Sequence, residues 1–227
     1  MKSRKDILWW VALLATISIA ACNDNTAQSS SEDLDPNRGL IGSVGAPMVF
    51  RFDNPTQDLE GWSTHSPHAW RVEDGSLVAE NAYNGTLWLD APIPAAARVE
   101  FDAKADKDGA FRIEIFGDGE THESGYVLVY NAWSGVAHLI GRLDEHEIDR
   151  VFITPSEALD PQHTYRMAIV RTDASLRWFV DGKLLLEYRD PAPLVGEGHN
   201  HLGLSNWSGR VRYDNVQVFD LGGEVLP

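Results

Sequence analysis

The sequence contains a single cysteine, Cys22, and few basic residues, with 19 Lys and Arg against 34 Asp and Glu. One cysteine excludes a disulfide framework, so a hydrophobic core has to hold the fold together. The formal net charge of −15 argues against a nucleic-acid partner, because binding to phosphate backbones needs an excess of basic side chains. The same repulsion disfavours acidic polysaccharides and leaves neutral glycans as candidate ligands.

A mostly apolar stretch, Ile7 to Ala21, lies at the start of the chain and follows Lys2, Arg4 and Lys5. It is too short to predict a membrane-spanning helix, and a basic segment followed by such a stretch is typical of an export signal. We therefore interpret residues 1–21 as a signal peptide. Its removal takes away three basic residues and one acidic residue, so the net charge becomes −17.

The signal ends at Ile19-Ala20-Ala21-Cys22, which resembles the bacterial lipobox. The resemblance implies cleavage before Cys22 and diacylation of its thiol, which tethers a protein to a membrane without a spanning segment. Asn23, which follows the cysteine, implies passage to the outer membrane in the same scheme. We expect a lipid-anchored protein of the bacterial cell envelope. An ordinary signal peptide, or an anchor helix with a spare thiol, is the alternative.

Residues 22–46 are polar, rich in Ser, Asp and Gly, and without a hydrophobic period. Such a segment cannot bury enough apolar surface to fold alone, so we interpret it as a flexible tether that begins at the lipidated cysteine. Residues 47–227 are long enough to form one domain with a substantial core.

Apolar residues in this domain recur at every second position, which is the period of a half-buried strand. The stretch from Arg98 to Ala105 alternates between apolar and charged side chains over its whole length. Similar runs occur at Met48–Asp53, Ser76–Glu80, Thr86–Leu89, Phe111–Phe116, Tyr126–Asn131, Val136–Leu143, Thr164–Arg171, Leu176–Val180, Lys183–Tyr188, His201–Ser205 and Val211–Phe219. No comparable stretch has the 3.6-residue period of a helix. The pattern predicts an all-β fold, a two-sheet antiparallel jelly-roll sandwich.

Two hairpin turns are predicted by Asp-Gly pairs between strand-like runs, Asp74-Gly75 and Asp181-Gly182. Asp-Gly accepts the positive φ angles that a two-residue primed turn requires. Trp133-Ser134-Gly135 is a third predicted turn.

Four segments in this order carry a family resemblance: FRFDNPTQDLEGW, WRVEDGSL, LRWFVDGKL and LGLSNWSGRVRYDNVQVF. Together they resemble the concanavalin A-like lectin/glucanase superfamily and, more narrowly, its laminin-G-like and 3-keto-disaccharide-hydrolase-like bacterial branches. The resemblance covers nearly all of residues 48–221 and implies the concanavalin A-like sandwich. The 3-keto-sugar branch implies hydrolysis or elimination at a glycosidic bond beside an oxidised carbon. Activity itself has to be argued from a site, because one fold hosts many functions.

The two ends of the domain carry candidate ligands for a metal ion, Asp53 after the first predicted strand and Asp214 in the last. First and last strands commonly lie side by side in such sandwiches, and the two carboxylates with backbone carbonyls could then hold a structural calcium ion. Capping of local turns is the alternative role for both. We expect no other cofactor to be required.

Arg142, Asp144, Glu145 and His146 gather where a predicted strand meets a loop. Carboxylates accept hydrogen bonds from sugar hydroxyls, arginine donates in a fork, and imidazole can move a proton near neutral pH. We predict Asp144, Glu145 and His146 as acid/base candidates and Arg142 as a ligand contact. A solvated loop whose charges neutralise one another is the alternative.

The loop that leads into the predicted strand His201–Ser205 carries His199, which is a fourth acid/base candidate, and His201, which is a candidate ligand contact. On an extended segment these two side chains project to the same side. Two histidines without a third ligand do not predict a metal site, so polar contacts are the favoured role.

Trp133 and Trp207 lie next to Asn, Ser and Gly and are predicted to be exposed, whereas Trp70 and Trp178 are predicted to lie in the core. Exposed aromatic faces stack against the apolar face of a pyranose ring. The neighbouring side chains of Asn131 and Asn206 could orient sugar hydroxyls.

The motif E-x-D-x-x-E of retaining glucanases is not completed at Glu100-x-Asp102 or at Glu114, and G-x-S-x-G, H-E-x-x-H and P-loop motifs are absent. The favoured function is therefore an envelope lipoprotein whose sandwich binds a neutral oligo- or polysaccharide. The alternatives are a glycoside hydrolase or lyase of the 3-keto-glycoside type that uses the acidic and His residues, and a structural domain that contacts other envelope proteins.

Overall fold

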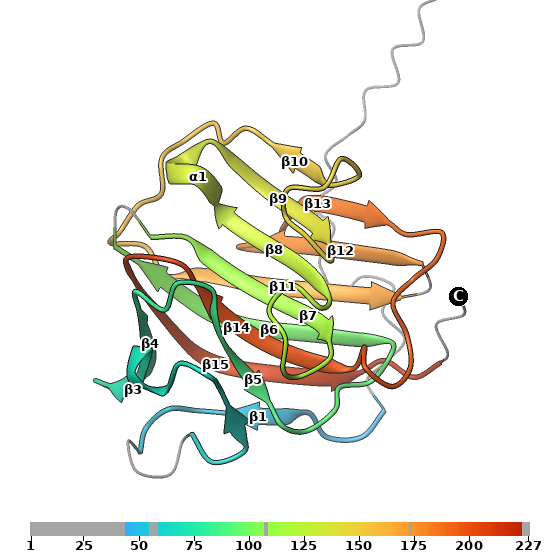
Figure 1. The fold of residues 1–227 in the computed structure, drawn as a ribbon, viewed down its shortest axis with the longest axis horizontal. Helices are drawn as coiled ribbons and strands as arrows, with labels where there is room; N and C mark the ends of the chain where they lie inside the picture. Colours follow the sequence, from blue (N-terminus) through green and yellow to red (C-terminus); the bar gives the residue numbers. More distant parts are fainter. Residues whose placement is uncertain (1–43, 55–58, 107–108, 173, 224–227) are drawn as a thin grey trace, which may run out of the picture. The chain divides into compact units, whose positions relative to one another are not determined.

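The computed structural model describes residues 44–54, 59–106, 109–172 and 174–223. The predicted signal peptide, Cys22 and most of the predicted tether lie outside these residues. Nearly all regular structure in the described part consists of strands in two stacked antiparallel sheets (Figure 1). The predicted fold class, an all-β concanavalin A-like jelly-roll sandwich, is confirmed. None of the helices among the described residues has the length and apolar character needed to cross a membrane.

The first sheet has eight strands. In spatial order they are β13(Lys183–Arg189), β12(Ser175–Val180), β11(Tyr165–Thr172), β6(Ala97–Ala105), β15(Arg210–Asp220), β4(Ser76–Glu80) and β3(Trp70–Glu73), with β1(Met48–Phe50) also paired to β15. The pairing of β1 with β15 brings the first and last strands side by side, as the sequence predicts.

The second sheet has seven strands. In spatial order they are β10(Val151–Ile153), β9(Ala137–Arg142), β8(Tyr126–Asn131), β7(Phe111–Gly117), β14(His201–Asn206), β5(Gly85–Leu89) and β2(Trp62–Ser63). Two short helical elements, η1(Pro67–Ala69) and α1(Ala132–Gly135), complete the described secondary structure. The edge strands β2 and β10 are too short for a period-two pattern and are not predicted by the sequence.

The core lies between the sheets and is built by the alternation of each strand. In β6, Val99 and Phe101 are fully buried, whereas Asp102 and Lys104 are half-buried on the other face. Full burial of one such apolar side chain stabilises a fold by about 1.5–3 kcal/mol. Trp70 and Trp178 are buried, as predicted.

The predicted turns are present. Asp74-Gly75 joins β3 to β4 with φ angles of 52° and 73°, and Asp181-Gly182 joins β12 to β13 with φ angles of 50° and 77°. The third turn is α1, in which the N–H of Val136 donates to the carbonyl of Ala132 at 2.9 Å. Val136 belongs to this turn, so β9 begins one residue later than predicted.

Asn206 at the end of β14 is hydrogen-bonded to the link between β4 and β5. Its side chain is fully buried, and its Oδ1 accepts a hydrogen bond from the backbone N–H of Ala82 at 3.0 Å. Ala82 belongs to the link between β4 and β5, which join different sheets. The side chain of Asn206, which the sequence predicts as a ligand contact, is therefore hydrogen-bonded to the backbone instead.

We expect Asn206→Ala to lower the free energy of unfolding by about 1–3 kcal/mol, because it leaves the buried N–H of Ala82 without an acceptor. Urea denaturation followed by tryptophan fluorescence measures the change. Asn200→Ala is the matched control, since the Asn200 side chain makes no hydrogen bond to other described residues. Equal losses in the two variants would contradict this role for Asn206.

Candidate functional site

A cavity of about 470 Å³ opens on the outer face of the seven-stranded sheet. Its walls come from β7, β8, α1 and the loops that follow β7, β9 and β14, so distant segments of the chain meet in it. The lining residues are Asn84, Ala110, Arg112, Glu123, Val129, Asn131, Ala132, Trp133, Ser134, Glu145, His146, Trp207 and Ser208. The volume falls within the range of about 300–1,000 Å³ that is typical of ligand sites.

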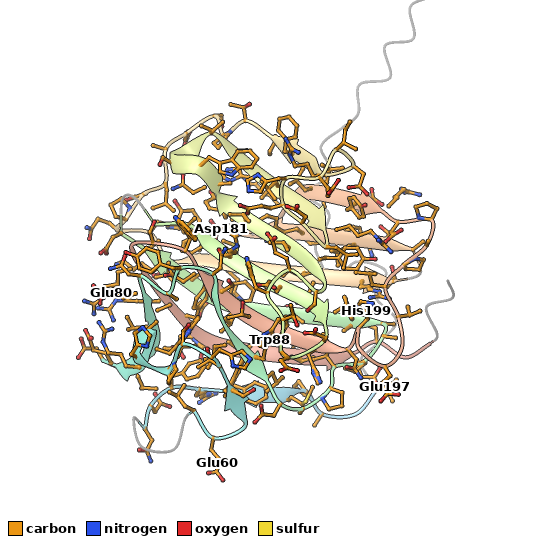
Figure 2. All side chains as sticks on the ribbon, in the orientation of Figure 1. Glu60, Glu80, Trp88, Asp181, Glu197 and His199 are labelled. Carbon is orange, nitrogen blue, oxygen red and sulfur yellow. The ribbon has the colours of Figure 1, made fainter. Side chains whose placement is uncertain are left out.

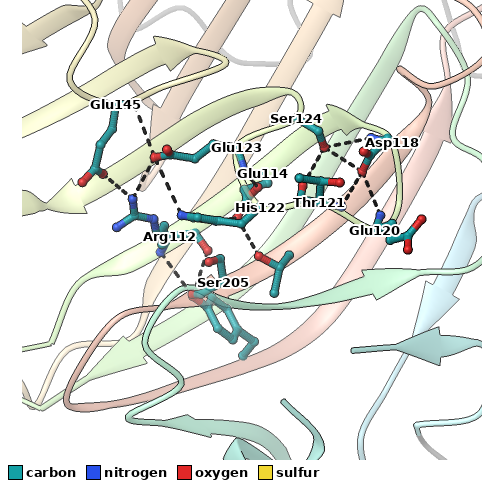
Figure 3. Close-up of polar contacts among 12 residues, drawn as sticks. Arg112, Glu114, Asp118, Glu120, Thr121, His122, Glu123, Ser124, Glu145 and Ser205 are labelled. Carbon is teal, nitrogen blue, oxygen red and sulfur yellow. Dashed lines mark hydrogen bonds and ion pairs between the residues drawn. The ribbon is translucent and has the colours of Figure 1, made fainter. Parts of the chain in front are cut away.

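The floor of the cavity carries a network of buried charges (Figure 3). Arg112 Nη2 lies 2.6 Å from Glu145 Oε2 and 3.2 Å from Glu123 Oε1. Arg112 and Glu145 are only 7% and 6% exposed. Burying charges is costly even when they are paired, so such a network on an outer sheet face indicates a function beyond stability.

Arg112 reaches this position because β7 alternates. Phe111, Ile113 and Ile115 point into the core, which directs Arg112 and Glu114 to the outer face. The loop between β7 and β8 then folds back over that face and supplies Glu123 (Figure 3). Two charged residues that alternation alone would leave in solvent are thereby buried.

Glu114 is fully buried beneath the same loop. It accepts hydrogen bonds from Thr86 Oγ1 at 2.6 Å and from the N–H of Glu123 at 2.6 Å, and it contacts His122 Nδ1 at 2.7 Å. Burial alone raises the pKa of a carboxyl group, but the hydrogen bond and charge of His122 and the Thr86 and Glu123 donors outweigh it, and the pKa of Glu114 is lowered. Glu114 therefore anchors the loop that forms one wall of the cavity.

Two exposed tryptophans, Trp133 and Trp207, stand at the rim, with 39% and 51% of their surfaces exposed. Trp133 is parallel to the ring of His146, with 5.8 Å between ring centroids and 20° between planes. Trp207 meets Tyr83 edge to face at 5.6 Å. Trp133 and Ser134 have φ angles of 51° and 58°, a left-handed conformation that is strained for residues with a Cβ and that is concentrated at functional sites.

The structure brings Asn131, Trp133, Glu145, His146 and Trp207 together in one cavity. His146 Nε2 lies 3.3 Å from Glu145 Oε1. The other acid/base candidate of this loop, Asp144, does not line the cavity; its Oδ1 accepts a hydrogen bond from the N–H of His146 at 2.7 Å and so shapes the loop.

Four predicted site residues lie elsewhere. Arg142 is paired with Asp190 at 2.9 Å, and Asn206 holds the backbone as described above. His199 contacts the carbonyl of Phe116 at 3.2 Å and lies at the lower right of the molecule, whereas α1 is at the upper left (Figures 1 and 2). His201 packs near Gly119, and burial lowers its pKa.

Of the candidate calcium ligands, Asp53 follows β1 and Asp214 lies in β15, the strand that pairs with β1. The pKa of Asp214 is raised, first by burial and then by the charges of Asp102 and Asp53. Within residues 44–54, 59–106, 109–172 and 174–223, no group of three or more His, Cys, Asp or Glu side chains is arranged to hold a metal ion.

Comparison with known protein families identifies the domain. Residues 51–219 match the model of the 3-keto-α-glucoside-1,2-lyase-like domain. The chain belongs to this family. No functionally curated protein matches the sequence.

Solved structures share the fold of this 3-keto-α-glucoside-1,2-lyase-like domain. A sialidase matches with a TM-score of 0.59 and 14% identity. The match covers 77% of this chain but only 18% of the sialidase. Carbohydrate-binding module CBM66 from Bacillus subtilis has a TM-score of 0.57 and 15% identity, covering 70% of this chain and 96% of the module. Laminarinase from Flavobacterium sp. UMI-01 has a TM-score of 0.57 and 13% identity, covering 78% of this chain and 100% of the laminarinase. The lyase-like domain is thus folded like glycosidases and carbohydrate-binding modules.

Arg112 and Glu123 are the charged residues of the lyase-like domain's cavity that sequence reasoning missed. A charged residue inside the apolar run of β7 is a weak signal for an outer-face position, and it does not tell which loop covers that face. Glu123 lies in a polar stretch with no motif.

We expect Glu114→Gln to destabilise the lyase-like domain at pH 7, because the buried carboxylate accepts three contacts, one of them from His122. The pKa of Glu114 is depressed in the folded state, so its stabilisation is present above the ordinary value of 4.5 and is lost as pH falls through the folded pKa. The difference in unfolding free energy between wild type and variant should therefore shrink below pH 4.5, as measured by urea unfolding at several pH values. Glu120→Gln, at an exposed position, is the control, and a pH-independent difference at Glu114 would contradict the role assigned to it.

Proposed function

We propose that this domain binds a neutral 3-keto-α-glucoside in the cavity and cleaves its glycosidic bond by elimination. The observation that carries the proposal is the contact of 3.3 Å between His146 Nε2 and Glu145 Oε1, next to the Trp133 ring on which His146 stacks. His146, Glu145 and Trp133 line one cavity, which supports the roles of base, orienting carboxylate and aromatic platform that we propose for them. The family match supports the choice of substrate class.

The proposed elimination requires one base from the protein. A carbonyl at C3 acidifies the proton on C2, so a neutral imidazole can accept that proton. The electron pair of the C2–H bond then forms the C1–C2 double bond, and the C1–O bond breaks with its electrons on the leaving oxygen. The proton held by His146 passes to that oxygen, which gives an unsaturated keto sugar and a free alcohol. Glu145, oriented by Arg112, stabilises the imidazolium between the two transfers.

The residues at the rim supply binding. Trp207, and the part of the Trp133 ring that His146 and Arg150 leave exposed, offer surfaces for the apolar side of a sugar ring. Asn131 lines the cavity, but its Nδ2 already donates to the carbonyl of Gly109 at 2.8 Å, so its side-chain role is to hold the base of α1.

His146→Gln should lower kcat for methyl 3-keto-α-glucoside about a hundredfold, because general-base assistance contributes at least about 10²-fold. Trp133→Ala should raise KM with a smaller effect on kcat. His163→Gln is the matched control: His163 Nε2 also contacts a carboxylate, Asp181 Oδ2 at 2.9 Å, yet His163 does not line this cavity. Full turnover by His146→Gln would refute the mechanism.

Binding without chemistry is the second candidate function. It is favoured by the engagement of both Glu123 and Glu145 with Arg112, which leaves no carboxyl group of the cavity free of an ion pair. Saccharide binding to the wild type without turnover, lost in Trp133→Ala and kept in His146→Gln, would select this function.

Both functions predict a preference for neutral ligands. Two carboxylates face one guanidinium in the cavity, so an added negative charge on the sugar meets net repulsion. We expect methyl α-glucuronide to bind at least about tenfold more weakly than methyl α-glucoside in calorimetric titrations at low salt, since juxtaposed like charges cost more than about 1 kcal/mol. Equal affinities would contradict the charge assignment.

We also propose that the protein is anchored in the bacterial cell envelope, through a lipid on Cys22 and at the outer membrane. This rests on the lipobox-like segment and the polar stretch at residues 22–46. A structural calcium ion bound by Asp53 and Asp214 remains a separate proposal that rests on the pairing of β1 with β15, which brings together the segments that carry the two residues.

A further inference from the structure

Arg171 in β11 carries a buried positive charge. It is only 2% exposed, because the alternation of β11 directs it between the sheets together with Met167 and Ile169. Its Nε, Nη1 and Nη2 atoms make no hydrogen bond within the described part of the chain. A guanidinium stays protonated in proteins, and a buried charge without a partner is costly. Arg171 therefore requires a partner that the described residues do not supply.

The contacts that Arg171 does make are with aromatic rings. Its guanidinium carbon lies 3.9 Å from the centroid of the Phe116 ring and 5.9 Å from that of Tyr126. These two residues lie on either side of the loop between β7 and β8, which supplies Glu123 to the candidate site. A ring face attracts a cation but is a weak hydrogen-bond acceptor. Stacking thus offsets part of the cost of burial and leaves the N–H groups of the guanidinium without acceptors.

The charge of Arg171 is not neutralised by the acidic residue beside it, Asp190. Asp190 Oδ2 accepts hydrogen bonds from the Tyr126 hydroxyl at 2.7 Å and from Arg142 Nε at 2.9 Å, and Oδ1 accepts one from the N–H of Ala192 at 2.8 Å. Burial lowers the pKa of Arg171 although the charge of Asp190 opposes this shift. Two guanidinium groups share one carboxylate, so one positive charge is left over.

A cavity of about 10 Å³ lies beside the guanidinium. The residues that line it are Tyr126, Arg171, Ala174, Ser175, Leu176, Tyr188, Asp190 and Pro193. This volume is close to the minimum of about 10–15 Å³ that holds one water molecule, so only a water or a monatomic ion fits. Ala174 is exposed and also lines a cavity of about 360 Å³ at the β12–β13 hairpin, which places the small cavity within reach of ions from solvent.

We propose that Arg171 binds a chloride ion in this cavity and that the ion is a structural part of the sandwich. One monovalent anion balances the charge that is left over, and it accepts the hydrogen bonds that the aromatic rings do not. A water molecule fits the same space but carries no charge. The bound ion would hold Arg171 of one sheet against Phe116 and Tyr126 of the other. The inference is independent of the proposed function.

Thermal unfolding in sodium chloride and in sodium methanesulfonate at equal ionic strength tests the inference, because methanesulfonate is too large for the cavity. We expect the Tm of the wild type to be about 2–4 °C higher in chloride, since an ion that binds only the folded state stabilises it. Arg171→Met should abolish this difference, because its flexible apolar side chain can pack against the same rings and carries no charge.

Arg177→Met is the matched control. Arg177 lies on the neighbouring strand β12, and its Nε is likewise buried without a hydrogen-bond partner in the described chain. It lines the cavity of about 360 Å³ but not the small one, so this variant should keep the difference in Tm between the two salts. No difference in the wild type, or the same loss in both variants, would overturn the inference.

Crystals of the wild type grown in sodium bromide give a second test that does not require Arg171→Met to fold. Bromide replaces chloride and scatters anomalously, so we expect an anomalous peak within hydrogen-bond distance of the Arg171 guanidinium. A water molecule at this position in saturating bromide would overturn the inference. A bromide peak there without chloride-dependent stabilisation of the wild type would show an adventitious ion only and would also overturn it.

Discussion

The cavity depends on the burial of charge on the outer face of a β-sheet. Arg112 stands on a strand whose other face is core, and it is removed from water only because two loops close over it and each supplies a carboxylate, Glu123 and Glu145. Without those partners, a guanidinium that is 7% exposed would be too costly to bury. The ion pairs thus fix the positions of both loops and, with them, the shape of the cavity.

The ion pairs of Arg112 also position the aromatic side chains of the cavity. Glu145 is held by Arg112, which places the next residue, His146, against the face of Trp133. Arg150 donates to the carbonyls of His146 and Glu147 at 2.6 and 2.7 Å, and its guanidinium lies 5.6 Å from the centroid of the Trp133 ring. Arg150 thereby connects the loop that carries His146 to the strained turn that carries Trp133.

Local rules predicted most of the fold. Period-two alternation located the long strands, and Asp-Gly pairs located two hairpins, because both signals depend only on neighbouring residues. The exposure of Trp133 and Trp207 also followed from their polar neighbours. The roles of Asn206 and Arg142 could not be predicted in this way. Whether such a side chain binds a ligand or another part of its own chain depends on which segment packs beside it, and here both bind the chain itself. The burial of Arg112 and Glu114 depends in the same way on the path of the loop after β7. That path cannot be predicted from hydrophobic periodicity, because loops have none.

The charge network is also the reason for proposing elimination and not hydrolysis. Hydrolysis by paired carboxyl groups needs one of them to donate a proton to the leaving oxygen. In this cavity both candidates, Glu123 and Glu145, serve Arg112 as acceptors, so neither is placed to act as that acid. Elimination beside a ketone has a different requirement, because a single base can take the ring proton and return it to the leaving oxygen. Under the proposed function, the contact of His146 with Glu145 meets that requirement, which is why we propose elimination from a keto sugar and not hydrolysis of an unoxidised glycoside.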